Sequence, residues 1–537
     1  MAGSSSWWRS GRGGTRASWW RWRCLIVRQR VTSPPHISAL LRSGATDAVA
    51  LSAPNRPDLT YGGLRRQADR TVEGLNVRGI GRGDRVAIVL PNGPEMASAF
   101  VSVAVGATTA PLNPGYRQPE FEFYLDDLEA KALVLAEGDD SPARAAAAAL
   151  GIRVLEIRTE DRWPAGVFDF ASPATGASPP RGGRAGTDDD ALVLHTSGTT
   201  SRPKIVPLLH RNVCATAGNI RRTLHLEAAD RCLNVMPLFH IHGLMACVLS
   251  TLHTGGSVYC APGFNALKVF AWLADADPTW YSAVPTMHQA ILARASRNAG
   301  IVERLRLRFI RSSSAALPAR VMAELEELFG APVVEAYAMT EAAHQMTCNP
   351  LPPAPRKPGT VGIAAGPDVS VMDAAGNHLA PGEEGEIVIR GANVTPGYEN
   401  NEAANRDAFT AGWFRTGDQG FSDEDGYFTI TGRLKEIINR GGEKISPREV
   451  DEVLMDHPAV QQVVTFAMPH PKLGEEVAAA VVLREGAEAG PGAIREFASG
   501  RLARFKVPRK VVVLDEIPKG PTGKLRRIGL AEQLGVG

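Results

Sequence analysis

The sequence predicts an α/β protein with a large multi-layer N-terminal domain, a β subdomain and a small α+β C-terminal domain. Between residues 58 and 334, short apolar strands alternate with helical stretches, and residues 85–90 are one such strand, ended by Pro91-Asn92-Gly93. This alternation is typical of α/β layers. From about Gly359 the pattern changes to short strands bounded by glycine, which indicates a β subdomain.

The individual elements follow in order along the chain. An alanine-rich helix is expected at 145–149, and the stretch 171–190, dense in Pro, Gly, Ser and Asp, is expected to be a surface loop. Further strands and helices follow from apolar runs and amphipathic spacing. The predicted strands are 258–260, 307–310, 333–334, 385–391, 426–432, 462–467 and 477–483, and the predicted helices are 319–329 and 447–457.

Composition limits the class of partner. The formal net charge is +2, but residues 1–46 contain eight Arg and no acidic residue, so the rest of the chain carries 51 basic against 57 acidic residues. A mildly acidic body argues against a nucleic-acid partner. No run approaches the roughly 18 apolar residues that span a bilayer, so stable membrane insertion is not expected. The six Cys are widely spaced without a metal-ligand grouping, which predicts free thiols.

The N-terminus has its own composition. Residues 1–34 hold five of the nine Trp among Arg, Ser and Gly, without helical periodicity. We predict a disordered extension and a cytoplasmic protein. The alternative is a mitochondrial transit peptide, because such leaders are rich in Arg and Ser and poor in acidic residues.

The segment 195–204 carries the first chemical signal. An apolar run at 191–194 predicts a buried strand, and it is followed by hydroxyl side chains, Gly198, Arg202 and Lys204. Hydroxyls, backbone N–H groups and cations at a turn are suited to bind polyphosphate oxygens. A Walker-type loop is disfavoured, because Pro203 precedes the lysine and Ile205 follows it. The expected nucleotide-binding residues are Thr196, Ser197, Gly198, Thr199, Thr200 and Lys204.

The segment 194–204 also resembles the phosphate-loop signature of the adenylate-forming superfamily, which includes acyl-CoA synthetases. Further segments resemble that superfamily's motifs and occur in the same order: 237–243 (PLFHIHG), 335–341 (EAYAMTE), 412–418 (GWFRTGD), 432–436 (GRLKE), 441–447 (GGEKISP) and 518–524 (PKGPTGK). The resemblance covers roughly residues 35–530. It implies an acyl-adenylate-forming fold with a nucleotide-binding domain at 35–432, a hinge at 433–435 and a small mobile domain at 436–537.

The resemblance also implies the reaction and its co-substrates. A carboxylate attacks the α-phosphorus of ATP, pyrophosphate leaves, and the thiol of coenzyme A then displaces AMP from the acyl adenylate, with Mg²⁺ as the metal. Lys524 matches the lysine that bridges the carboxylate and the α-phosphate. Thr340 matches the residue that donates to the α-phosphate. Glu341 matches the metal ligand, and Mg²⁺ favours such a carboxylate.

Other matched positions concern the nucleoside and the second half-reaction. Tyr337 matches the residue that stacks on adenine, Asp418 has the two acceptor oxygens that a ribose diol needs, and Arg433 matches a ribose contact. Lys435 matches the hinge residue about which the small domain rotates. Gly441 and Gly442 have minimal side chains that would let the pantetheine thiol approach.

One position departs from the superfamily pattern. The superfamily usually has glycine directly after the lysine of the phosphate loop, whereas this chain has Ile205. A β-branched residue disfavours positive φ, so a less pliant or differently shaped loop is expected. This departure leaves a catalytically quiet nucleotide-binding protein as an alternative of another class.

Within the superfamily the chain most resembles oxalyl-CoA synthetases, through 195–204, 279–289, 309–315 and 338–344. His242, Ser312 and His344 match positions that line the acyl pocket, and polar donors there suit a second carboxylate better than an alkyl tail. The favoured substrate is therefore oxalate or another small polar acid. A medium- or long-chain fatty acyl-CoA ligase is the alternative. The oligomeric state is not predicted.

Overall fold

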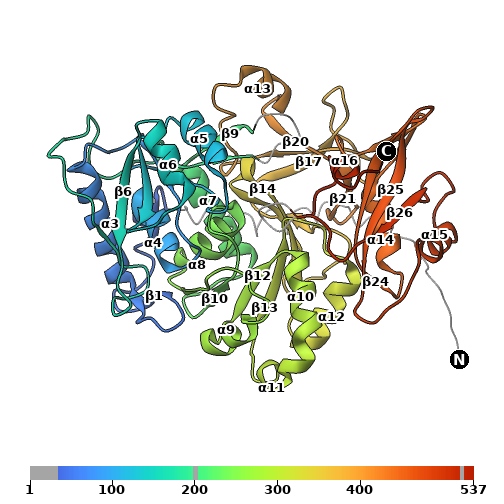
Figure 1. Ribbon diagram of the computed structural model, residues 1–537, viewed down its shortest axis with the longest axis horizontal. Helices are drawn as coiled ribbons and strands as arrows, with labels where there is room; N and C mark the ends of the chain where they lie inside the picture. Colours follow the sequence, from blue (N-terminus) through green and yellow to red (C-terminus); the bar gives the residue numbers. More distant parts are fainter. Residues whose placement is uncertain (1–33, 197–202, 520–524, 537) are drawn as a thin grey trace, which may run out of the picture.

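The computed structural model describes residues 34–196, 203–519 and 525–536. Its strands form four sheets, which run from left to right in Figure 1 roughly in chain order. The predicted α/β class, with a β subdomain and a smaller α+β C-terminal part, is confirmed. The predicted extension at 1–34 lies outside the described residues except for its last residue, Pro34.

The first large sheet has seven strands and is mainly parallel. Its order is β7-β6-β5-β3-β4-β8-β9, with antiparallel edges at β6–β7 and β8–β9. The strands are β3 (Arg85–Ile88), β4 (Thr108–Pro111), β5 (Ala132–Ala136), β6 (Arg153–Arg158), β7 (Asp169–Phe170), β8 (Asp190–His195) and β9 (Ile205–Leu209). The helices between residues 34 and 149 are α2 (Ile37–Leu40), α3 (Tyr61–Asn76), α4 (Pro94–Ala104), α5 (Gln118–Asp127) and α6 (Pro142–Ala149).

The second sheet, at the centre of Figure 1, has nine strands in the order β16-β15-β14-β13-β12-β10-β11-β1-β2. The strands are β1 (Val49–Ser52), β2 (Leu59–Thr60), β10 (Arg231–Asn234), β11 (Ser257–Cys260), β12 (Trp280–Ala283), β13 (Phe309–Ser313), β14 (Val333–Met339), β15 (His344–Cys348) and β16 (Ile363–Ala364). Strands β10 to β14 and β1 pair in parallel.

Helices cover both faces of this sheet, because its parallel strands are buried on both sides. One face packs on α9 (Val269–Ala276), α10 (Pro285–Ala295) and α12 (Ala319–Phe329). The other packs on α7 (His210–Thr223) and on the π-helix η1 (His242–Leu249). Shorter elements complete this part: α8 (Ser250–Leu252), η2 (Ser296–Asn298), α11 (Ala299–Val302) and η3 (Thr340–Ala342).

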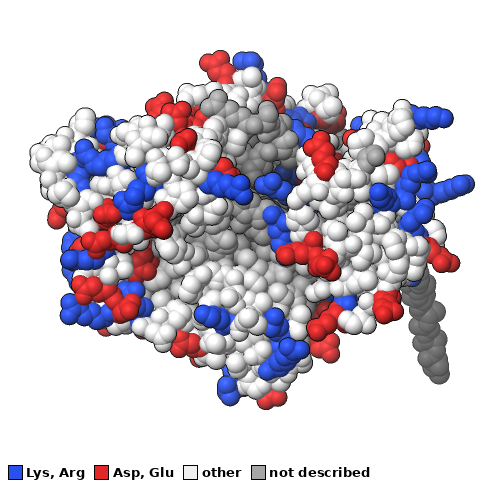
Figure 2. Space-filling model, in the orientation of Figure 1, with Lys and Arg blue, Asp and Glu red and all other residues white. Residues whose placement is uncertain are grey.

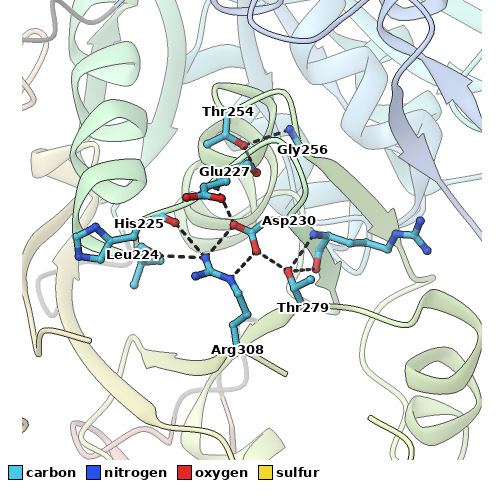
Figure 3. A network of polar contacts seen from close by, with 9 residues as sticks. Leu224, His225, Glu227, Asp230, Thr254, Gly256, Thr279 and Arg308 are labelled. Atoms are coloured by element: carbon cyan, nitrogen blue, oxygen red, sulfur yellow. Dashed lines mark hydrogen bonds and ion pairs between the residues drawn. The ribbon is translucent and has the colours of Figure 1, made fainter. Parts of the chain in front are cut away.

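The amino ends of these parallel strands are joined by a polar network (Figure 3). The Asp230 carboxylate, which precedes β10, accepts two hydrogen bonds from Arg308, both 2.8 Å long. The Thr279 hydroxyl donates to the same carboxylate over 2.7 Å, and the Glu227 amide over 2.8 Å. Residues 230, 279 and 308 each lie one position before a strand, so this network fixes the strand starts and leaves the carboxyl ends for a site.

The β subdomain and the C-terminal part follow. The β subdomain contains β17 (Asp368–Met372), β18 (Gly385–Arg390), β19 (Phe409–Thr410), β20 (Trp413–Ser422) and β21 (Phe428–Arg433), with α13 (Glu402–Ala408). The C-terminal sheet, red in Figure 1, contains β22 (Ile438–Arg440), β23 (Glu443–Ile445), β24 (Val460–His470), β25 (Gly474–Leu483) and β26 (Lys510–Val513). Its helices are α14 (Pro447–Met455), α15 (Pro491–Ser499) and α16 (Leu530–Gln533).

Two predictions from composition are answered here. Cys214, Cys232, Cys247, Cys260 and Cys348 are free and buried, as expected, while Cys24 lies outside the described residues. Within the described ranges, every helix is too short or too polar to cross a bilayer.

Candidate active site

The site lies where the carboxyl ends of the parallel strands meet the β subdomain and the C-terminal part. Side chains on or after β8, β10, β13 and β14 carry most of the predicted roles. Ligand sites in such sheets form at the carboxyl ends of the strands. Figure 2 shows a hollow on the visible face between the large and small parts of the molecule, with Lys and Arg side chains at its rim.

The ends of the phosphate loop are held by the β8–β9 pair. The Thr196 amide donates to the Lys204 carbonyl over 2.9 Å, and the Lys204 amide donates to the Thr196 hydroxyl over 3.3 Å. The two ends of the loop are therefore fixed beside each other. Ser197, Gly198, Thr199 and Thr200 lie outside the described residues, so their role in phosphate binding stays a prediction.

Ile205 is a strand residue. It is the first residue of β9, it pairs with His195, and its side chain is buried. A β-branched side chain is favourable at such a position. The isoleucine that replaces the superfamily's usual glycine therefore lies in a regular β-strand, where no positive φ is needed.

Glu341 and Lys204 meet at Tyr398. The Tyr398 hydroxyl donates to Glu341 Oε1 over 2.8 Å, and Lys204 Nζ lies 4.2 Å from the centre of the Tyr398 ring. Burial raises the pKa of Glu341. Burial and the nearby Lys435 cation lower the pKa of Lys204. Lys204 and Lys435 repel each other, and a bound polyphosphate would offset that repulsion. The Glu341 carboxylate beside them is suited to hold the metal ion that accompanies a polyphosphate.

Tyr337, Asp418 and Arg433 form one connected group. The Tyr337 hydroxyl hydrogen-bonds to Asp418 Oδ2, and Arg433 Nε donates to Asp418 Oδ1 over 2.7 Å. Asp418 and Arg433 are paired across β20 and β21. Each Asp418 oxygen thus already accepts one hydrogen bond, and a carboxylate oxygen can accept another. In the predicted ribose contact, Asp418 would therefore accept hydrogen bonds from the ribose in addition to those from Tyr337 and Arg433.

The turn from β14 to β15 carries three predicted site residues. Thr340 and Glu341 lie in the short helix η3, and His344 opens β15. Ala343 (φ 47°) and His344 (φ 112°) have left-handed backbone conformations. For residues other than glycine this costs on the order of 1–3 kcal/mol each and is often found at functional sites.

The predicted acyl-pocket residues His242 and His344 are in contact. Both are fully buried, and their rings stack with centres 5.1 Å apart. His242 Nε2 lies 2.6 Å from the Ser282 hydroxyl, and Nδ1 lies 3.1 Å from the Ser314 hydroxyl. Ser312 is buried on β13, and its hydroxyl has no hydrogen-bond partner among the described residues. The pocket region is therefore polar in its interior.

Sequence reasoning missed three neighbours of this region: Ser282, Arg311 and Gln345. Arg311 is fully buried on β13, and its guanidinium nitrogens lie 3.3–3.5 Å from Gln345 Oε1, Ser282 Oγ and His242 Nε2. The signal in the sequence was an arginine directly after the apolar residues of a predicted buried strand. Tyr398 was also missed, because it comes from a loop 57 residues beyond Glu341.

The hinge and the glycine pair are placed differently from each other. Lys435 is exposed and lies two residues after the end of β21. Gly441 (φ 59°) and Gly442 (φ 99°) form the two-residue turn between β22 and β23. A hairpin turn with both central residues at positive φ favours glycine. This local requirement explains the glycines, and their predicted role at the pantetheine thiol stays a prediction.

Lys524 lies outside the described residues, but the chain that follows it is held in place. Arg527 donates to Asp451 over 2.5 Å and to the Thr465 carbonyl over 2.8 Å, both in the C-terminal part. The pKa of Tyr116 is raised by burial, and the Arg526 cation opposes that shift. Arg526 is therefore near Tyr116 of the N-terminal domain.

Comparison with known proteins identifies the class. The AMP-binding enzyme family matches residues 41–399, and the AMP-binding enzyme C-terminal domain matches residues 449–524. The chain belongs to the AMP-binding enzyme family. The predicted class, an ATP-dependent acid–CoA ligase that uses Mg²⁺ and coenzyme A, is confirmed.

Individual relatives are similar over nearly their whole length. An oxalate–CoA ligase of Arabidopsis thaliana is 44% identical over 499 residues, which cover 91% of this chain and 97% of that protein. The long-chain-fatty-acid–CoA ligase FadD13 of Mycobacterium tuberculosis is 32% identical, covering 95% of this chain and 97% of its own. The crystal structure of ATP-bound MatB from Rhodopseudomonas palustris is 30% identical with a TM-score of 0.83, covering 93% and 99% of the two chains.

Proposed function

We propose that this ligase activates oxalate, or another small acid with a second anionic group, and transfers it to coenzyme A. The observation that carries the proposal is the polar interior around His242, in which His344, Ser282 and Arg311 are all fully buried. An alkyl chain placed here would offer no hydrogen bond to Arg311 Nε or to the Ser312 hydroxyl, which have no partner among the described residues, and no charge to offset the guanidinium. Greater identity to the oxalate–CoA ligase (44%) than to the fatty-acid ligase (32%) supports the same choice.

The site residues divide the work between the two anions. Lys204 and Lys435 offset phosphate charge, and Glu341 would hold Mg²⁺, which neutralises phosphate oxygens when bound. Asp418 and Tyr337 hold the nucleoside, while Thr340 at the end of β14 donates to the α-phosphate. Positioning and charge neutralisation are the main sources of catalysis in this type of reaction.

A substrate panel tests the proposal. Purified protein with ATP, Mg²⁺ and coenzyme A is given oxalate, malonate, acetate, octanoate or palmitate, and AMP release is followed. Oxalate is expected to give the highest kcat/KM. A preference for octanoate or palmitate would favour the fatty acyl-CoA ligase instead. Absence of pyrophosphate release with every acid would favour a catalytically quiet nucleotide-binding protein.

We infer that residues 436–537 rotate about 433–435 between the two half-reactions, so that Lys524 serves only the first. Lys435 is exposed at this junction, and the Leu434 amide donates to the Gly417 carbonyl over 3.0 Å, one contact that rotation would break. Lys524→Ala is expected to lower adenylate formation by about 100-fold or more. The same variant should largely retain thioester formation from supplied acyl adenylate. Equal loss of both half-reactions would contradict this role.

We also propose that the protein acts in the cytoplasm. Five buried free thiols are typical of a reducing compartment. Cell fractionation tests the proposal. Recovery with mitochondria, in a form shortened at its N-terminus, would favour the transit-peptide alternative.

A further inference from the structure

Arg311 is a buried cation without a carboxylate partner. The residue is 0% exposed. Its three side-chain contacts are Gln345 Oε1 at 3.3 Å, Ser282 Oγ at 3.4 Å and His242 Nε2 at 3.5 Å. Among the described residues, Arg311 Nε has no hydrogen-bond partner and no Asp or Glu forms an ion pair with the guanidinium. Every contact is thus to an uncharged acceptor and is long.

Such a charge is unfavourable unless something offsets it. Burial lowers the pKa of the Arg311 guanidinium, yet an arginine in a protein stays protonated. Burying an unpaired charge carries a large desolvation penalty. Because the described residues provide no anion beside it, a negatively charged ligand close by would gain the stabilisation that a carboxylate normally provides.

A hydrogen-bond relay connects this charge to the acyl pocket. Arg311 Nη1 donates to Ser282 Oγ, so the Ser282 proton is available to His242 Nε2 at 2.6 Å. With Nε2 accepting, His242 carries its proton on Nδ1, which faces Ser314 Oγ at 3.1 Å. The His242 ring stacks on His344. The relay therefore sets both the tautomer and the orientation of a predicted substrate residue.

Gln345 holds Arg311 Nη2, on the side of the guanidinium away from Ser282. Gln345 Oε1 accepts from Arg311, and Gln345 Nε2 donates over 3.2 Å to Thr223 Oγ1 and to the Ala365 carbonyl. These bonds fix the amide orientation with its oxygen towards the cation. Ser282 of β12 and Gln345 of β15 thus hold the guanidinium of Arg311 in one position behind His242.

We propose that Arg311 is a specificity-determining positioning residue, whose buried charge, acting through Ser282 and His242, selects acids that carry a second negative charge. This inference rests on the proposed function and adds the source of its selectivity. The reacting carboxylate and the nucleotide are bound by other residues. Loss of the Arg311 charge should therefore change the choice of acid far more than the use of ATP.

The test compares oxalate with oxamate, in which an uncharged amide replaces one carboxylate at nearly the same size. AMP release by the full-length protein gives kcat and KM for both acids and for ATP. The wild type is expected to prefer oxalate. Arg311→Met should lower the oxalate-to-oxamate ratio of kcat/KM by about 100-fold, mainly through the KM for oxalate, with KM for ATP changed less than threefold.

Two further variants keep the test decisive if Arg311→Met does not fold. Arg311→Lys retains the charge without the planar fork and should keep part of the selectivity. Ser282→Ala removes the relay and should lower the ratio by about tenfold. An unchanged ratio in Arg311→Lys and Ser282→Ala, or an equal loss with both acids and with ATP, overturns the inference. A wild type that prefers octanoate or palmitate to oxalate overturns the proposed function instead.

Discussion

Arg308 directly precedes β13 and Arg311 lies at its middle, three residues further on, and the protein compensates their charges differently. Arg308 is paired with Asp230, whose carboxylate also accepts from Thr279 and from the Glu227 amide (Figure 3). Among the described residues, the Arg311 side chain contacts only uncharged acceptors. The first arrangement is complete without a ligand and lies at the amino ends of the strands. The second lies nearer the carboxyl ends, where the predicted acyl pocket begins. We therefore interpret the Arg308 charge as structural and the Arg311 charge as functional.

Glu335 is a third buried ionisable residue, and its burial is compensated in another way. Glu335 on β14 is 2% exposed, accepts a hydrogen bond from the Leu317 amide, and has its pKa raised to about 7 by burial. A carboxylate can lose its charge by protonation, whereas a guanidinium cannot. Glu335 therefore needs no anionic or cationic ligand, and Arg311 does. This contrast gives three predictions with decreasing effects.

The largest effect is expected when Asp230 loses its partner. Arg308→Met leaves a carboxylate that is 3% exposed without its cation. Breaking such a pair typically costs 3–5 kcal/mol, and the 39% exposure of Arg308 reduces the expected loss to about 2–3 kcal/mol. Urea unfolding measures it. The oxalate-to-oxamate ratio should be unchanged, because the network is at the other end of the sheet.

Arg306→Met is the matched control for this stability loss. Arg306 is exposed and, within the described part of the chain, its side chain donates only to backbone carbonyls. Its replacement should therefore change the unfolding free energy by less than about 0.5 kcal/mol. Equal stability of the Arg306→Met and Arg308→Met variants would remove the distinction between the paired charge of Arg308 and the charge of Arg311.

The second prediction concerns Glu335 and pH. Its folded-state pKa of about 7 lies above the ordinary value of 4.5. Between these pH values the folded state binds more protons than the unfolded state, so stability falls as pH rises from about 4.5 to 7. Glu335→Gln should remove this loss and stabilise the protein at pH 7.5 by about 1–2 kcal/mol, because burial of the amide NH2 group offsets part of the gain. Urea unfolding at several pH values measures the difference from wild type.

The stability difference between wild type and Glu335→Gln separates the effect of Glu335 from that of other titrating groups. Burial lowers the pKa values of His210, His253 and His288 to about 4. These histidines make stability rise between about pH 4 and 6.5, which opposes the Glu335 effect. A wild-type-minus-variant difference that is flat from pH 4.5 to 7 would show that Glu335 stays charged in the fold.

The sequence predicted local elements better than relations between distant residues. Helix α12 was predicted with both of its ends, because its buried stripe is amphipathic and Gly330 ends it at φ 62°. Strand β8 followed from one apolar run. His242 and His344 were predicted as pocket residues through family resemblance alone, and their stacking depends on how η1 meets β15.

Arg311 and Tyr398 could not be predicted from local sequence. The role of Arg311 depends on the register that places Ser282 of β12 beside it. Tyr398 reaches Glu341 only through the packing of the 395–399 segment on β9, where the Thr395 hydroxyl donates to the Pro207 carbonyl. Such relations depend on tertiary structure, and a single sequence does not show them. The residues that bind the phosphates and the catalytic Lys524 remain predictions.

The third prediction, with the smallest expected effect, concerns Glu341. Like Arg308, this buried residue has a protein partner, and like Arg311 it lies in the candidate site. Glu341 has a protein partner, the Tyr398 hydroxyl, and also lies near the Lys204 cation, which is positioned over the same ring. Tyr398→Phe removes one hydrogen bond to a charged group and keeps the ring. We expect kcat/KM for ATP to fall by about tenfold, with the oxalate-to-oxamate ratio unchanged. AMP release at varied ATP and Mg²⁺ measures it.

Tyr427 supplies the matched control for Tyr398→Phe. Its hydroxyl donates to the Pro355 carbonyl over 2.6 Å, and Lys357 Nζ lies 4.4 Å from its ring centre, which repeats the lysine–tyrosine geometry without a carboxylate acceptor. Tyr427→Phe should leave kcat/KM for ATP within twofold of wild type. If both variants lost activity equally, the Tyr398 hydroxyl would contribute only to stability, and the orientation of Glu341 would have to come from its backbone, where the Thr395 amide donates to the Glu341 carbonyl over 2.7 Å.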